Sequence, residues 1–193
     1  MENKLRQLES PIRKVVLFGP ESTGKTTLSK QLASHYQTLW IPEYARAYLQ
    51  TKWDEKAEIC TYEDLMPIAE GQMQSENQAV AELVENQGQL LICDTDLLET
   101  AVYSQLYFDK VPAALNQAVA DNTYDLYLLT DIDVPWQKDD LRDRPDHRAA
   151  YYQKFKEALE LNKKNYIPIA GSKTERLTKA ISAIDKILTP GLC

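Results

Sequence analysis

Short apolar runs alternate along the chain with longer segments in which apolar residues recur at helical spacing. Five of these runs have the length and composition of strands that are buried on both faces of a parallel sheet. Pro42 cannot donate a ladder hydrogen bond, so we expect the second run to end there. The predicted strands span residues 14–18, 38–43, 89–93, 124–130 and 166–170.

The segments between the strands show the apolar spacing of helices. Thr61 and Asp64 could form a capping box, but Pro67 favours a later helix start with Asp64 as the N-cap. Gly88 is a natural C-cap for the same helix. The predicted helices cover about residues 28–36, 44–50, 64–87, 97–107, 111–120, 149–162 and 174–188, and the polar residues 51–63 read as a loop.

Strands separated by helices predict an α/β fold, with a parallel five-stranded sheet, helices on both faces and right-handed crossovers. Residues 1–12 read as a polar leader. Residues 13–190 read as a single domain in which about 136–148 form a lid. In such sheets, ligands bind outside the carboxyl ends of the strands. The candidate functional residues below all fall at those ends.

Residues 19–26 read Gly-Pro-Glu-Ser-Thr-Gly-Lys-Thr, a complete match to the phosphate-binding loop (P-loop) pattern. The match follows a predicted strand and opens a predicted helix, which is the context that the motif requires. Lys25 would reach the β- and γ-phosphates of ATP, and the Thr26 hydroxyl would ligate Mg²⁺. The fold expected is therefore a three-layer P-loop NTPase sandwich. The candidate nucleotide-binding residues of the loop are Gly19, Glu21, Ser22, Thr23, Gly24, Lys25, Thr26 and Thr27.

Acidic residues follow two other predicted strands. Asp94 comes directly after an apolar run, where an acid is expected to hold the metal. Asp96 either shares that site, on the metal or the acceptor, or caps the following helix. Glu43 would accept the proton of an attacking hydroxyl or orient it, although an acid there would also suit the helix dipole. Together with Lys25, these three acids are candidate catalytic residues.

Arginines cluster after the fourth predicted strand. Arg142, Arg144 and Arg148 lie within seven residues, and a lid carrying them would neutralise the triphosphate and exclude water. We expect Arg142 to act in catalysis and the other two to bind nucleotide. The interleaved aspartates leave a solvated loop with local ion pairs as the alternative. Arg46, one turn after Glu43, either contacts the substrate or forms a surface ion pair.

Aromatic side chains near the same strand ends could stack on a base or a pyridine ring. Trp40 and Tyr48 are among them, although most tyrosines in such helices belong to the core or its rim. The candidate substrate-binding residues are Glu43, Tyr44, Arg46, Asp96 and Tyr103.

Composition narrows the class of protein. The chain has 193 residues and a net charge of −7. This charge disfavours a protein that binds nucleic acid through a broad basic surface. It does not disfavour a phosphate ligand, because the backbone dipoles of a loop act locally. Its three cysteines form no C-x-x-C pair, which suits a reducing compartment. The first residues lack the apolar core of a signal peptide, and no run approaches the length of a membrane span. We expect a cytoplasmic protein with a small-molecule substrate and no nucleic-acid or membrane partner. A homo-oligomer is left open.

Four segments together resemble a known family. They are the P-loop, Pro-Glu-Tyr-Ala-Arg at 42–46, Cys-Asp-Thr-Asp at 93–96 and Val-Pro-Trp-x-x-Asp-x-Leu-Arg at 134–142. This combination is similar to the ribosylnicotinamide kinase domain of the NadR-type NAD-biosynthesis proteins. The resemblance spans about residues 13–188.

The resemblance implies a P-loop kinase that transfers the γ-phosphate of ATP to the 5′-hydroxyl of nicotinamide riboside. By motif, Lys25 and Thr26 would hold nucleotide and Mg²⁺. Glu43 with Asp94 or Asp96 would face the metal and the acceptor, and Arg142 would belong to the lid. The alternatives are a kinase for another nucleoside or nucleotide, and an ATP-binding sensor without an acceptor. A ring ATPase is least expected, because no helical lid domain follows the last predicted strand.

Overall fold

The computed structural model describes residues 4–139, 141 and 145–189, and it contains a five-stranded parallel sheet in the order β2-β3-β1-β4-β5. Its strands are β1 (Arg13–Phe18), β2 (Trp40–Ile41), β3 (Leu90–Asp94), β4 (Leu126–Thr130) and β5 (Tyr166–Ile169). β1 lies at the centre between β3 and β4, so the loop that follows β1 opens between the ends of its two neighbours. The predicted strand number and parallel pairing are confirmed.

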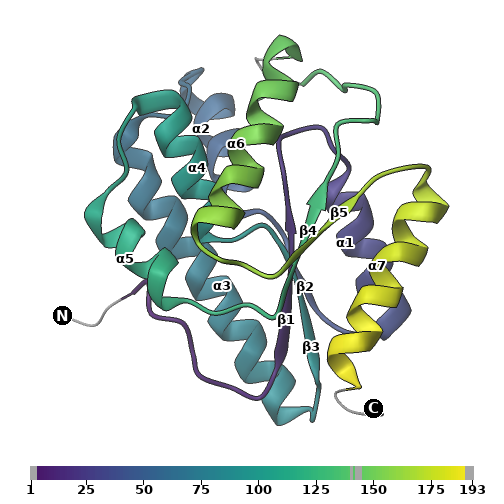
Figure 1. Cartoon of the computed structure of the whole chain (residues 1–193). Coiled ribbons are helices and arrows are strands. Elements are labelled where there is room, and N and C mark those ends of the chain that lie inside the picture. Colours follow the sequence, from purple (N-terminus) through teal and green to yellow (C-terminus); the bar gives the residue numbers. More distant parts are fainter. Residues whose placement is uncertain (1–3, 140, 142–144, 190–193) are drawn as a thin grey trace.

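Helices cover both faces of the sheet (Figure 1). Helices α1 and α7 pack on one face, and α3, α4, α5 and α6 pack on the other, which gives the predicted three-layer sandwich. Their bounds are α1 (Lys25–Tyr36), α2 (Tyr44–Lys56), α3 (Leu65–Glu85), α4 (Leu97–Phe108), α5 (Ala113–Asp121), α6 (Arg148–Leu161) and α7 (Lys173–Leu188), with 3₁₀ turns η1 (Tyr62–Asp64) and η2 (Pro145–His147).

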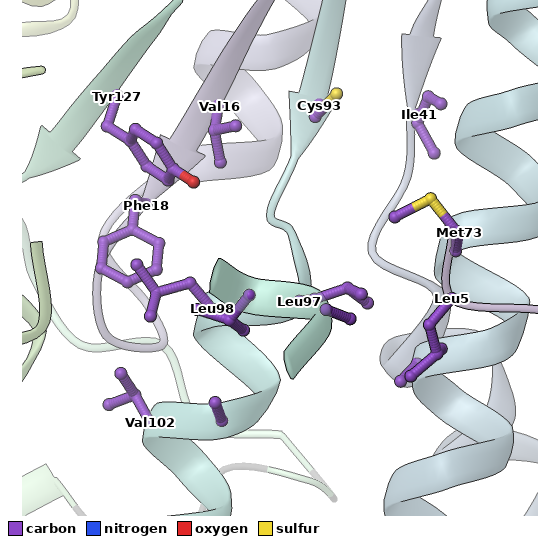
Figure 2. Close-up of a cluster of buried hydrophobic side chains, with 14 of the residues drawn as sticks. Leu5, Val16, Phe18, Ile41, Met73, Cys93, Leu97, Leu98, Val102 and Tyr127 are labelled. Carbon is purple, nitrogen blue, oxygen red and sulfur yellow. The ribbon is translucent and has the colours of Figure 1, made fainter. Parts of the chain in front are cut away.

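The two faces of the central strand belong to two separate cores. Val16 and Phe18 lie in the larger core on the α3–α6 side, and Val15 and Leu17 lie in the smaller core under α1 and α7. This alternation follows from the two-residue period of a strand. Figure 2 shows Phe18 beside Tyr127 of β4, whose ring makes an edge contact at 5.6 Å between centroids. The sheet is thus fixed on both sides beneath the P-loop.

The segment before β1 is packed against the domain. Leu5 is 3% exposed and enters the larger core beside Met73, as Figure 2 shows. Gln7 donates to the buried Glu76 carboxylate of α3 at 2.7 Å and accepts from the backbone of Thr123 at 2.9 Å. The segment predicted to be a polar leader is therefore packed as part of the domain from residue 4 onward.

Two predicted boundaries in the first half of the chain were wrong. β2 has only two residues, and α2 continues to Lys56 through much of the segment expected to be a loop. The polar residues 51–56 were misread because no residue of α2 is buried, so the helix carries no apolar stripe that a sequence pattern can reveal. Lys52 holds the helix instead, with its Nζ 2.6 Å from Oδ2 of Asp64 in η1.

The capping at both ends of α3 differs in part from the prediction. The helix begins after Asp64, as expected, and the capping box between Thr61 and Asp64 is present as well, on the preceding η1 turn. At the other end Gln87, not Gly88, adopts the left-handed conformation with φ 57°. The Gly88 N–H donates to the Leu83 carbonyl at 2.7 Å, so Gly88 lies one residue beyond the left-handed position. No helix among the described residues has both the length and the hydropathy needed to cross a bilayer.

Candidate active site at the carboxyl edge of the sheet

The P-loop connects β1 to α1 and requires glycine at its first position. Gly19 has a φ of 139°, and a Cβ added there would lie 2.7 Å from Oγ1 and 2.9 Å from the carbonyl oxygen of Thr130 at the end of β4. Gly24 has a φ of 84° but open space around it. The first glycine therefore serves both close packing and conformation, and the second serves conformation alone.

Cationic side chains hold the carbonyl groups of the loop. Arg176 of α7 donates to the Thr23 carbonyl at 2.8 Å, and Arg148 of α6 donates to the Ser22 carbonyl at 3.2 Å. The peptide bonds of the loop are trans, so the N–H groups of the next residues, Thr23 and Gly24, point to the opposite side. This arrangement turns amide donors toward the space where phosphate oxygens bind in a P-loop.

Lys25 is buried at the start of α1 and has three polar contacts. Its Nζ donates to the carbonyls of Gly19 at 2.6 Å and Pro20 at 3.2 Å, and lies 3.1 Å from Oε1 of Glu99. Burial acts to lower the pKa of Lys25, but the carboxylates of Glu99, Glu43 and Asp94 outweigh burial and raise it. Lys25 is therefore charged and surrounded by carboxylates.

Glu99 is a functional candidate that sequence reasoning missed. It lies in the first turn of α4 and is 2% exposed. Burial raises its pKa to about 8, Glu43 adds to the rise, and Lys25 opposes it. The available signal was a glutamate in the otherwise apolar stretch Leu-Leu-Glu-Thr-Ala-Val, one turn after the Asp-Thr-Asp segment.

Asp94 ends β3 as predicted and is 1% exposed. Neither of its carboxylate oxygens is satisfied by a hydrogen bond from the described residues. Burial, followed by the charge of Glu43, raises its pKa to about 6, while Thr26 and Lys25 act in the opposite direction. Thr26 itself is exposed at the start of α1. A buried carboxylate beside the hydroxyl of Thr26 fits a magnesium ion that is also ligated by phosphate and water.

Asp96 serves as the helix cap, one of its two predicted roles. One oxygen accepts from the N–H of Glu99 at 3.2 Å and the other accepts from the Tyr127 hydroxyl at 2.6 Å. Both oxygens are therefore committed to α4 and β4. Thr95, between the two aspartates, has a φ of 83°, an uncommon value for a β-branched residue and one that is found at functional turns.

Glu43 stands directly before α2 and is partly exposed. Its side chain forms no cap hydrogen bond with the helix. Its charge contributes to the pKa shifts of Lys25, Asp94 and Glu99, so its carboxylate lies within electrostatic range of all three. Of the predicted catalytic residues that the structure describes, Lys25, Glu43 and Asp94 are brought together.

The predicted aromatic and arginine contacts lie around this cluster. The Tyr103 hydroxyl accepts from the N–H of Glu21 in the P-loop at 3.0 Å. Tyr44 packs its ring against Gly71 of α3, where a Cβ would lie 2.2 Å from the ring. Arg46 pairs with Asp139 at 3.0 Å. Tyr103 thus supports the loop, Tyr44 packs at the base of α2, and Arg46 connects α2 to the predicted lid.

Residues 131–139, which follow β4, extend beyond the carboxyl edge of the sheet (Figure 1). The Gln137 N–H donates to Oγ of Ser22 at 2.8 Å. Arg148 also donates to the Val134 carbonyl at 3.0 Å, and its guanidinium lies 5.7 Å from the centre of the Trp136 ring. The segment is therefore bonded to the P-loop. The predicted lid residues Arg142 and Arg144 lie outside the described residues.

Of the two remaining threonines, one has a buried side chain and the other is exposed. The Thr23 side chain is buried, and its hydroxyl bonds to the Pro20 carbonyl and to Oγ1 of Thr130, each at 2.7 Å. Thr27 is exposed on α1. Sequence reasoning also missed Arg176, which is 5% exposed and holds Thr23 from the far end of the chain.

Known proteins share this architecture. A protein-family model described as an AAA domain matches residues 14–176. The trifunctional NAD biosynthesis/regulator protein NadR of Salmonella typhimurium is 26% identical over 160 residues, covering 82% of this chain and 38% of that protein. The NadR protein of Escherichia coli is 28% identical over 131 residues, covering 68% of this chain and 31% of that protein. The chain thus spans about a third of these relatives.

Solved structures give the same fold. A crystal structure of NadR protein in complex with NR superposes with a TM-score of 0.77 at 24% identity, over 91% of this chain and 51% of that chain. Thymidylate kinase from Ehrlichia chaffeensis superposes with a TM-score of 0.62 at 16% identity, over 93% of this chain and 100% of that chain. The predicted P-loop kinase fold and the resemblance to NadR-type proteins are confirmed.

Proposed function

We propose that this chain, which belongs to the AAA-domain family of the matching model, is an ATP-dependent kinase that phosphorylates the 5′-hydroxyl of nicotinamide riboside. The product would be nicotinamide mononucleotide. The observation that carries the proposal is the meeting of Lys25, Glu43 and Asp94 at one edge of the sheet, beside a P-loop whose amides are turned outward. Phosphoryl transfer requires a cation, a metal-holding acid and a group that positions the acceptor, and these three residues supply that set.

The donor half follows from the loop. The N–H groups after Ser22 and Thr23 would bind the phosphates, and Lys25 would turn from its carbonyl partners to the β- and γ-phosphate oxygens. Thr26 and, through water, Asp94 would hold Mg²⁺. When bound, that ion would neutralise charge on the phosphates. Arg148, already at the Ser22 carbonyl, would bring a second cation close to the same charge.

The acceptor half is assigned to Glu43. Its carboxylate has no cap hydrogen bond to α2 and lies next to Lys25 and Asp94, so it is available to orient the attacking hydroxyl and to accept its proton. The segment tied to Ser22 and Arg46 would cover the reacting groups and exclude water, which would otherwise compete with the alcohol. Nicotinamide riboside as the acceptor is supported by the Pro-Glu-Tyr-Ala-Arg segment and by the NadR relatives.

A coupled ADP-release assay over a panel of nucleosides tests the proposal, with the product identified by mass spectrometry. We expect nicotinamide riboside to stimulate ADP release most strongly and to gain one phosphoryl group. Stimulation by another nucleoside, and not by nicotinamide riboside, would refute the acceptor and retain a kinase. Slow hydrolysis that no nucleoside stimulates would refute the kinase and favour an ATP-binding sensor.

A further inference from the structure

The Lys25 ammonium group is fully occupied where it lies. It has three protons, and the structure gives it three acceptors: the Gly19 carbonyl at 2.6 Å, the Pro20 carbonyl at 3.2 Å and the Glu99 carboxylate at 3.1 Å. The Lys25 side chain is 8% exposed, so water cannot readily replace these partners. To reach a phosphate, Lys25 must give up at least part of this set.

Glu99 depends on Lys25 in turn. Its side chain is 3% exposed, and Lys25 is the cation paired with it among the described residues. The Thr95 hydroxyl also acts on this carboxylate, but it is neutral and cannot balance the charge. Removing one member of a buried ion pair leaves the other charge desolvated and uncompensated, which is strongly unfavourable. Glu99 therefore cannot remain ionised at no cost once Lys25 has turned away.

The other charges around the pair increase this effect. Glu43 enters from the start of α2, and Asp94 enters from the end of β3. Tyr103, one turn further along α4, lies near Glu99 and near Glu21 of the P-loop. Apart from Lys25, the titratable neighbours named here are acids or a neutral phenol, and the arriving phosphates add further negative charge. A proton on Glu99 is the change that relieves the repulsion.

We propose that Glu99 is a positioning residue that holds Lys25 in place before nucleotide binds, and that it takes up one proton when Lys25 moves to the phosphates. The proton comes from solvent and converts the carboxylate to a carboxylic acid, with no other bond changed. This inference rests on the proposed nucleotide binding, but not on the identity of the acceptor.

The pKa of Glu99 gives the pH window. Burial raises it to about 8 while Lys25 is still beside it, and loss of that cation can only raise it further. At the low end of the range part of the Glu99 population is already protonated before nucleotide binds, so the average uptake is smaller there. Above a pH of about 8 the carboxylate is ionised before binding and must be protonated on binding, so the uptake grows and the affinity falls with rising pH.

Isothermal titration with Mg²⁺ and a non-hydrolysable ATP analogue tests the proposal between pH 7.5 and 9. A titration of the analogue with Mg²⁺ alone at each pH gives the protons that its own phosphates release, and these are subtracted. Running each pH in two buffers of different ionisation enthalpy gives the number of protons taken up. For the wild type we expect uptake to approach one proton toward pH 9, with the affinity falling by up to roughly tenfold per pH unit.

Glu99→Gln keeps the size of the side chain and removes its titration, so its affinity should be nearly independent of pH across the same range. Glu76→Gln is the matched control. It neutralises another buried glutamate, whose Oε1 lies 3.2 Å from Nζ of Lys14, and this pair is not part of the P-loop. The control should keep the proton uptake of the wild type.

Uptake that is absent in the wild type, or unchanged in Glu99→Gln, would overturn the proposal. The wild-type result decides alone if the variant does not fold. Proton uptake with normal analogue binding, but without phosphorylation of nicotinamide riboside, would support Glu99 and refute only the proposed acceptor. Failure of the analogue to bind at any pH would overturn both.

Discussion

Replacing Arg176 should loosen the P-loop from behind. Its guanidinium donates to the carbonyls of Gly171 at 3.0 Å, Thr23 at 2.8 Å and Asp131 at 2.9 Å, and it also pairs with Asp133. One side chain of α7 therefore connects the P-loop, the segment after β4 and the turn before its own helix. Arg176→Ala removes all these contacts at once.

The expected loss of stability follows from the burial of those partners. A hydrogen bond from a charged donor contributes about 1.5–3 kcal/mol, and breaking a buried ion pair costs about 3–5 kcal/mol. The Asp133 side chain is 36% exposed and can be rehydrated when its partner is removed. The expected loss of stability therefore lies near the lower bound of the range for a buried ion pair. We expect Arg176→Ala to lower the free energy of unfolding by about 3 kcal/mol. A domain with ordinary stability would still fold.

The loss should also reach nucleotide binding. Without its donor, the Thr23 carbonyl can rotate, and the N–H of Gly24 on the same peptide rotates with it. We expect the KM for ATP to rise about tenfold, equivalent to 1.4 kcal/mol of lost binding. Arg176→Lys retains one cation but not the planar fork, so it should lie between the wild type and Arg176→Ala in both measurements.

Urea unfolding followed by fluorescence gives the stability, and the coupled ADP assay gives the KM. An Arg176→Ala protein that unfolds at the wild-type urea concentration would show that these bonds contribute no net stability. A protein that is destabilised as expected, but has an unchanged KM for ATP, would refute the argument that Arg176 orients the amides of the P-loop.

Four other substitutions separate roles within the site. Gly19→Ala should abolish binding of the ATP analogue, measured by calorimetry, because its Cβ would lie 2.7 Å from a threonine hydroxyl of β4. Gly24→Ala should weaken binding less, because the space around Gly24 is open. Equal effects of the two substitutions would contradict the packing argument. Glu43→Gln should lower kcat at least about 100-fold with little change in analogue affinity, and equal loss of both would indicate a structural or metal-bound residue. Tyr103→Phe should raise the KM for ATP a few-fold at constant kcat by freeing the Glu21 N–H; an unchanged KM would show that the hydroxyl does not position the loop.

The parts of the fold that were predictable are those with local periodicity. Buried strands such as β3 contain continuous apolar runs, and helices such as α7 carry an apolar stripe, so the layers and the parallel sheet follow from sequence. α2 lacks such a stripe because no residue of it is buried, so the sequence of its second half predicts a loop. Where burial does not decide the structure, periodicity gives no signal.

The predictable parts of the site are those that adjoin a strand end or belong to a motif. Asp94 and the P-loop satisfy both conditions. Asp96 had two roles open, and only the three-dimensional neighbour Tyr127, with its hydroxyl 2.6 Å from the carboxylate, decides for the cap. Arg176 and Glu99 could not be assigned, because each acts on a P-loop residue at least 74 positions away in sequence. A charged residue in a helix reads as exposed until its partner is known.

The supports of the P-loop are of two kinds. The Ser22 and Thr23 carbonyls are held by arginines on their far side, so these bonds can persist while phosphates occupy the amide side. The Gly19 carbonyl is held by Lys25, the residue that the nucleotide would draw away, whereas the Pro20 carbonyl keeps the Thr23 hydroxyl at 2.7 Å. Nucleotide binding would thus change the contacts at the β1 end of the loop and leave its α1 end fixed. Because the amides belong to the fixed end, the Lys25–Glu99 pair can separate, and Glu99 can change its protonation state, without disturbing the groups that bind the phosphates.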